Sequence, residues 1–175
     1  MDMKKTVWLF LAVILMAAGL AGCSSSDDDD SGSGEDTSIP VIAESAVSSD
    51  IVAFFNTELP KMSGSLSPGF FVGSTQNVCR IINSKQELEK YYDGERELPA
   101  IDFNAYTLVV GQQRMSHSSC YAEKFTIRRG YNCVVLNLYV NSADSHYDVV
   151  TNMYYWGLCS KFYAKNVMVN IIQQN

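Results

Sequence analysis

The sequence predicts an α+β fold, in which residues 39–175 form a single domain with a mainly antiparallel β-sheet and one or two short helices. Two observations lead to this prediction. Apolar residues recur at helical spacing in two short stretches before residue 93, whereas β-branched and alternating runs dominate after residue 100. Helices and strands that occupy separate parts of a chain are typical of α+β proteins, and an apolar share of 47% is sufficient for a packed core.

The first helix is predicted to begin near Ser49 or Asp50, either of which can cap it, and to end at Pro60. Four apolar residues follow the spacing that lies on one helical face: Ile51, Phe54, Phe55 and Leu59. Residues 63–69 are rich in Ser, Gly and Pro, which predicts a loop. Two short apolar runs follow and are predicted strands: 70–72 and 78–82.

A second helix is predicted after Ser84. Ser84 and Glu87 have the spacing of a capping box, in which a hydroxyl and a carboxylate each accept a hydrogen bond from a backbone N–H group that the helix leaves unpaired. Leu88 and the aromatic residues 91–92 follow at helical spacing, and Gly94 is the predicted terminator.

The rest of the chain is predicted to form strands, because β-branched residues and apolar–polar alternation replace the helical spacing. Arg129-Gly130 offers a turn between two of these strands, and residues 141–148 form a polar loop. Val134, Leu136, Leu138 and Val140 share one face and are predicted to point into the core. The predicted strands are 106–110, 125–128, 133–140, 153–158 and 167–172.

Three segments of this region resemble a known family: Ile82–Leu88, Leu98–Phe103 and Tyr106–Gly111. A serine before a short helix, a Leu-Pro-x-x-Asp-Phe turn and a hydrophobic strand follow one another as in small Bacteroidetes surface lipoproteins. The order is similar also to that in the C-terminal domain of PrcB-like proteins, which are accessory lipoproteins of an outer-membrane protease complex. The resemblance covers roughly residues 78–172 and implies an accessory lipoprotein.

The N-terminus has the pattern of a signal peptide. Lys4 and Lys5 precede an uncharged stretch, 7–20, which as a helix would span about 21 Å and is too short for a bilayer core of about 30 Å. Leu-Ala-Gly-Cys then ends at Cys23 and resembles the lipobox of bacterial lipoproteins. This resemblance implies removal of residues 1–22, a lipid on the Cys23 sulfur and attachment to the outer membrane.

Residues 23–38 are predicted to be a flexible acidic tether, because Ser, Gly, Asp and Glu dominate them. A serine-rich and then acidic run after the lipid cysteine looks like the surface-export signal of Bacteroidetes lipoproteins, which implies a position facing the cell exterior. The alternative is attachment at the periplasmic leaflet. The tether also accounts for most of the acidity. The whole chain has a formal net charge of −6, whereas residues 39–175 hold 12 acidic and 11 basic residues. Such a balance argues against nucleic-acid binding.

Four cysteines remain besides the lipid attachment residue: Cys79, Cys120, Cys133 and Cys159. An exported protein enters an oxidising compartment, so an even number permits two disulfides, in any of three pairings. The alternative is four buried free thiols that pack as small apolar groups. The absence of a Cys-x₂-Cys pair argues against a zinc site.

The sequence predicts no catalytic, metal-binding or cofactor-binding residue. His146 and Asp148, with Asp144 nearby, are two or three polar groups in a loop, and His117 lies in a serine-rich turn. A metal site needs three or four converging ligands, so these residues are predicted to be solvated. Asp102 follows a proline and is predicted to fix a turn by accepting backbone N–H bonds. No nucleophile elbow or phosphate loop occurs, and we expect a protein that is not an enzyme.

Aromatic residues near the C-terminus are the last candidates for ligand contact: Tyr147, Tyr154, Tyr155 and Trp156. Exposed rings could stack on a glycan, whereas buried rings would simply pack within a sheet. The sequence therefore predicts a lipid-anchored, surface-exposed, non-catalytic module of the outer membrane that contacts another protein. The alternative is a lipoprotein that binds a glycan or small ligand through these aromatics.

Overall fold

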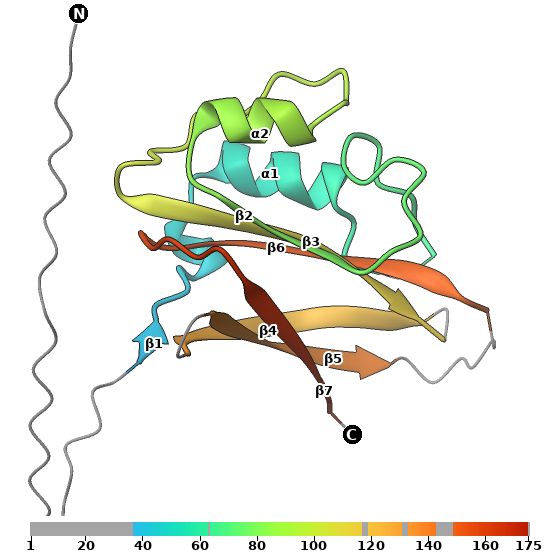
Figure 1. Cartoon of the computed structure of the whole chain (residues 1–175). Helices are drawn as coiled ribbons and strands as arrows, with labels where there is room; N and C mark the ends of the chain where they lie inside the picture. Colours follow the sequence, from blue (N-terminus) through green and yellow to red (C-terminus); the bar gives the residue numbers. More distant parts are fainter. Residues whose placement is uncertain (1–36, 63, 117–118, 131–132, 143–148, 175) are drawn as a thin grey trace, which may run out of the picture. The chain divides into compact units, whose positions relative to one another are not determined.

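The computed structural model describes residues 37–62, 64–116, 119–130, 133–142 and 149–174, all within a compact unit of residues 34–175. They form a layer of two α-helices, a three-stranded sheet beneath it and a four-stranded sheet below that (Figure 1). The elements are β1 Ser38–Ile39, a 3₁₀ turn Glu44–Ala46, α1 Ser49–Glu58, β2 Val78–Ile82, α2 Lys85–Tyr91, β3 Tyr106–Met115, β4 Cys120–Arg129, β5 Val134–Ser142, β6 Thr151–Ser160 and β7 Val167–Gln173.

The strands confirm the predicted α+β class but divide between two sheets. The three-stranded sheet has the order β2-β3-β6 and is antiparallel throughout. The four-stranded sheet has the order β1-β4-β5-β7, and its last pair, β5 and β7, is parallel. The chain crosses from one sheet to the other between β6 and β7, so β7 arrives beside β5 in the same direction instead of reversing in a hairpin.

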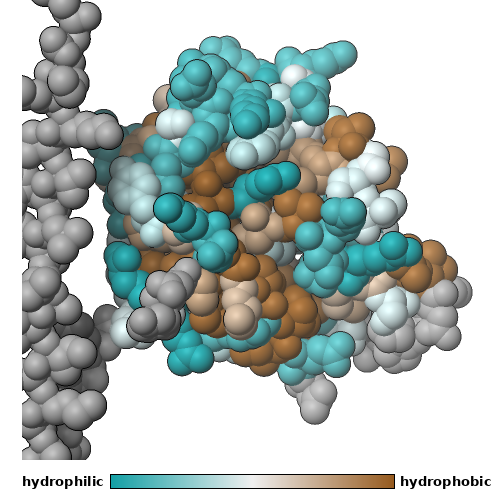
Figure 2. All heavy atoms as spheres, viewed as in Figure 1, coloured by the Kyte–Doolittle hydropathy of each residue, from teal (hydrophilic) through white to brown (hydrophobic). Residues whose placement is uncertain are grey.

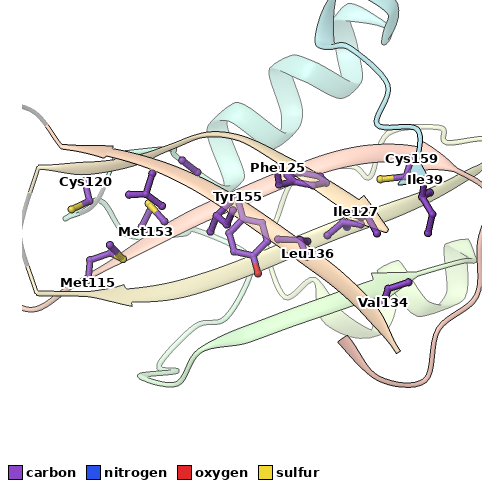
Figure 3. Packing of buried hydrophobic residues seen from close by; sticks show 14 of the residues in the cluster. Ile39, Met115, Cys120, Phe125, Ile127, Val134, Leu136, Met153, Tyr155 and Cys159 are labelled. Atoms are coloured by element: carbon purple, nitrogen blue, oxygen red, sulfur yellow. The ribbon is translucent and has the colours of Figure 1, made fainter. Parts of the chain in front are cut away.

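β6 is buried on both faces, which explains its nearly continuous apolar sequence. Its odd-numbered side chains, such as Met153 and Tyr155, face the four-stranded sheet (Figure 3), and its even-numbered ones, such as Trp156, face the helices. The protein therefore has two apolar cores, one between the sheets and one beneath the helices. α1 contributes Phe55 to the second core, where its ring stacks on Trp156 with 4.9 Å between centroids.

The predicted helix start at Ser84 is confirmed in α2, but the Glu87 carboxylate pairs one residue earlier than in a capping box. The Ser84 hydroxyl accepts a hydrogen bond from the Glu87 N–H at 3.1 Å, and the Glu87 carboxylate accepts one from the Asn83 N–H at 2.6 Å. Gly94, however, does not end the helix, since the capping residue is Tyr92 in an extended conformation. The ring of Tyr92 covers Gly94 and leaves no room there for a Cβ atom.

The predicted strand at 70–72 is wrong. Phe71 has a φ of 54°, a left-handed conformation that an extended strand does not permit. The neighbouring Phe70 turns its ring inward, where it packs against Phe55 and Tyr92. Burial of an aromatic ring beneath the helices determines this local backbone, so the apolar run indicates core packing and not a strand.

Asp102 has the predicted turn-fixing role. Its carboxylate accepts a hydrogen bond from the Asn104 N–H at 3.0 Å, and its carbonyl accepts one from the Tyr106 N–H at 2.9 Å, where β3 begins. Within the described part of the chain, no helix is both long enough and apolar enough to span a bilayer.

Candidate functional site: an open groove between the two sheets

The two lateral edges of the stacked sheets differ. At one edge, residues 40–42 run along β6 and pair with it: the Ile42 N–H donates to the Leu158 carbonyl at 2.8 Å, and the Ser160 N–H donates to the Pro40 carbonyl at 2.9 Å. At the other edge, β2 and β7 are the outermost strands of their sheets. A cavity of about 440 Å³ opens between them, and we call it the β2–β7 groove.

Apolar side chains from both edge strands line part of the β2–β7 groove, and polar residues such as Asn77 and Gln113 line the rest. Val167, Val169 and Ile171 line it from β7, and Cys79 and Ile81 line it from β2. All but Ile171 are partly buried and extend the core between the sheets, while Ile171 is 37% exposed. β7 lies at the front of Figure 1, and Figure 2 shows hydrophobic side chains gathered on this part of the surface. The inter-sheet core is thus incompletely covered at this edge.

Tyr155 closes the inner end of the groove. It is opposite Gly111 in the β3–β6 register, and Gly111 is opposite Cys79 in the β2–β3 register, so the three residues lie in one row across the sheet. The Tyr155 ring lies over Gly111, where a Cβ atom would be 2.0 Å from the ring carbon Cζ. The Tyr155 hydroxyl hydrogen-bonds the Cys79 thiol, and burial raises the pKa of this hydroxyl well above 10.

The rim of the groove carries positive charge. The Arg80 guanidinium lies over the ring of Tyr91, 4.7 Å from its centroid, and Lys165 lies just before β7. Both cations are exposed. None of the described residues that line the groove is Asp or Glu. A ligand for this site would therefore combine apolar groups with a negative charge.

A second cavity, of about 510 Å³, lies at the opposite edge and differs in character. The segment that pairs with β6 passes over it, and the Lys61 ammonium forms an ion pair with the Glu44 carboxylate at 2.5 Å. Its cationic and acidic lining residues are equal in number, with Lys124 and Glu123 as the other two. Because the chain already covers this edge and its charges are balanced, the β2–β7 groove is the stronger candidate.

The four cysteines are free thiols, so the structure contains neither of the two disulfides that the sequence permits. Cys120 is opposite Ser142 at one end of the β4–β5 pair, whereas Cys133 lies just before β5 at the other end. Cys79 and Cys159 are on β2 and β6, and β3 separates these strands. For the pairing of Cys120 with Cys133 and Cys79 with Cys159, the strand register thus keeps the members of each pair apart.

The thiols are expected to differ in reactivity. Burial raises the pKa of Cys79 from 9.0 to about 11 and that of Cys159 to about 12, so both stay protonated at neutral pH, and protonated thiols are poor nucleophiles. In the unfolded chain the pKa of a cysteine thiol is near 9.0. Cys79 therefore makes its full contribution to the free energy of unfolding below pH 9 and loses it as the pH rises toward 11.

Alkylation under non-reducing conditions tests this assignment. Cys79 and Cys133 are both half-buried, but the raised pKa of Cys79 keeps its thiol protonated. We therefore expect iodoacetamide to modify Cys133 of the folded protein before Cys79, and Cys133→Ser to remove this first reaction. After unfolding without reductant, all four thiols should react. A count of fewer than four in the mass spectrum would mean that a disulfide has formed.

Three of the four aromatic residues predicted as ligand contacts are packing residues. Tyr154 and Trp156 lie beneath the helices and Tyr155 lies between the sheets, with exposed fractions of 3%, 6% and 3%. The Trp156 indole N–H donates to the Asn56 side-chain oxygen at 3.1 Å, so its polar group is also satisfied internally. This burial corrects the glycan-stacking hypothesis for these three residues, because stacking needs an exposed ring face.

Several sequence candidates lie outside the described residues: Cys23, His117, Asp144, His146, Tyr147 and Asp148. Within the residues that the structure does describe, no three His, Cys, Asp or Glu side chains converge closely enough to hold a metal ion. The sequence pattern alone did not reveal the β2–β7 groove or the role of Gly111. A glycine inside a β-branched run was the available signal, since it often marks a close approach by another group.

In comparisons with known proteins, no protein family, no curated protein and no solved structure matches the chain. The resemblance to small Bacteroidetes lipoproteins and to PrcB-like proteins therefore stays a prediction.

Proposed function

We propose that this protein is a lipid-anchored, non-catalytic interaction module of the outer membrane, and that another protein binds it at the β2–β7 groove. In this proposal residues 1–22 are a signal peptide, residues 23–38 a lipidated tether and residues 39–175 a single α+β domain. The observation that carries the proposal is the open edge of the two sheets, where apolar side chains of both edge strands and two exposed cations lie together.

The edge strand β7 supports a binding role. Natural edge strands are usually protected by charged residues, prolines or bulges, because an unprotected edge pairs readily with other chains. Val167–Gln173 contains no charged residue and no proline. Met168 on the outer face is 55% exposed and Ile171 at the groove is 37% exposed. An apolar edge of this kind is typical of a surface that a partner covers.

The N-terminal pattern supports attachment and display. Lipid chains contribute about 0.8 kcal/mol per buried CH₂ group, so two or three chains on Cys23 would hold the protein at the membrane. The roughly 15-residue tether then extends about 20 Å from the anchor, which leaves the groove free to meet other membrane-associated proteins. The acidic run within this tether is proposed to direct export to the outer face.

Surface biotinylation of intact cells tests the display step. We expect a membrane-impermeant reagent to label the full chain, and deletion of residues 27–30 to abolish labelling while leaving the total amount of protein unchanged. Replacement of the same residues by serines controls for tether length and should also abolish it. Labelling that persists in both variants would contradict the export role of the acidic residues.

Site-specific photo-cross-linking tests the binding role. A photoreactive residue at Ile171 should give a discrete higher-mass adduct in cells, whereas one at Thr57, an exposed residue of α1, should not. Fragmentation of the adduct should place the cross-link in a second protein. Absence of an adduct at Ile171, or the same adduct at both positions, would overturn the proposed function.

A further inference from the structure

We infer that the partner contributes an extended segment that adds to the four-stranded sheet as a new strand beside β7, with apolar side chains at alternate positions and acidic residues near Arg80 and Lys165. This inference rests on the proposed function and specifies its partner. Three features of the groove carry it: the direction of the free backbone groups of β7, the direction of its side chains and the charge of the rim.

The backbone N–H and C=O groups that point away from β5 belong to the odd-numbered residues of β7. The Asn166 carbonyl accepts a hydrogen bond from the Val134 N–H at 3.0 Å, and the Gln174 N–H donates to the Val140 carbonyl at 2.9 Å. The backbone N–H and C=O groups of the even-numbered residues of β7 therefore point toward β5. Because successive residues of a strand direct these groups to opposite sides, the groups of Val167 and Val169 face outward. No described residue pairs with them.

The same odd-numbered residues line the groove with their side chains. A strand that hydrogen-bonds to them would place every second side chain on the groove side of the sheet. Apolar side chains there would cover Val169, Ile171 and the half-buried Cys79, and so complete the core between the sheets. The cavity of about 440 Å³ lies within the roughly 300–1,000 Å³ range of ligand pockets.

The positive charge of the groove rim favours an acidic partner segment. Arg80 and Lys165 have no carboxylate beside them among the lining residues, so an acidic segment complements the groove and a basic one is repelled. A second copy of β7 would supply the apolar alternation but no charge, since residues 167–173 contain none. It would leave both cations unpaired, which favours a segment from a different protein.

Two labelled peptides test the inference on the full lipidated chain in detergent. The first, acetylated and amidated, is Glu-Val-Thr-Val-Thr-Val-Thr-Val-Glu, and the second has Lys in place of both Glu residues. By fluorescence anisotropy, we expect the acidic peptide to bind about tenfold more tightly, with a difference that narrows as salt is added. Equal binding of the two peptides, or binding of neither, would overturn the inference.

Substitutions on the protein locate the bound peptide. Val169→Pro removes an outward N–H and leaves the β5–β7 hydrogen bonds in place, so it should weaken binding of the acidic peptide about tenfold, whereas Val169→Ala keeps the N–H and should have a smaller effect. Arg80→Ala with Lys165→Ala should abolish the preference for the acidic peptide and provides a test if Val169→Pro does not fold. Binding unaffected by all of these changes would contradict strand addition.

The outcomes separate this inference from the proposed function. If neither peptide binds but the photo-cross-link at Ile171 still captures a second protein, the groove has a partner and strand addition is wrong. If the cross-link joins two copies of this chain and sedimentation shows a dimer that Val169→Pro dissociates, the occupant is a second β7 and the acidic partner is wrong. If the cross-link is also absent, the proposed function fails.

Discussion

Replacement of Gly111 by alanine is expected to destabilise the fold by about 3 kcal/mol, at the upper end of the usual cost of overpacking a core. The added Cβ atom would lie 2.0 Å from Cζ and 2.3 Å from the hydroxyl oxygen of Tyr155. The ring cannot retreat easily, because Tyr155 is 3% exposed and packs against Phe125 at 6.3 Å between centroids. Thermal unfolding followed by circular dichroism should show a midpoint lower by roughly 10 °C.

Two further variants identify the cause. In a Tyr155→Ala background, Gly111→Ala should have little additional effect, because the clashing ring is gone; a cost that adds fully would contradict the packing explanation. Gly73→Ala provides a comparison of a different kind. Gly73 has a φ of +71° and open space around it, so alanine there meets only the conformational cost of about 1–2 kcal/mol.

Replacement of Cys23 by alanine is expected to have the largest effect on location. Without the sulfur there is no atom to receive the lipid, so labelled palmitate should not enter the protein, and the chain should keep residues 1–22. Cys133→Ala should retain both labelling and processing, since that thiol belongs to the folded unit. Metabolic labelling followed by electrophoresis reads out both properties.

One result would contradict lipid attachment at Cys23. If the Cys23→Ala protein is processed and sediments with the membranes as the natural protein does, an element other than the lipid holds it there. The proposal of a tethered lipoprotein would then be wrong, while the fold and the groove would be unaffected.

Local signals predicted the local elements well. The i, i+3, i+4 stripe predicted α1, and the Ser84–Glu87 pair predicted the start of α2, because both depend on neighbours within one or two helical turns. The alternation of β5, buried at every even position from Val134 to Val140, gave its core face correctly. The strand predicted from the apolar run at 70–72 was wrong because this segment depends on a residue far along the chain. The ring of Tyr92 packs against Phe70 and so determines the local backbone.

The candidate site could not be predicted in the same way. Tyr154, Tyr155 and Trp156 were attractive as ligand contacts only while their environment was unknown, and two separate cores bury them. The groove is formed by β2 and β7, whose residues are more than 80 positions apart. Its cations, Arg80 and Lys165, have no sequence relationship that would indicate that they share a rim.

The sequence by itself determined the class of fold, the positions of both helices and most strands, and the N-terminal pattern from which lipid attachment is predicted. Only the tertiary structure decided that the strands divide between two sheets, that β7 lies parallel to β5, and that one edge is covered while the other is open. The physical reason is that the periodicity of apolar residues and helix capping depend on residues a few positions apart. Strand partners depend instead on the burial of apolar faces that come from the whole chain.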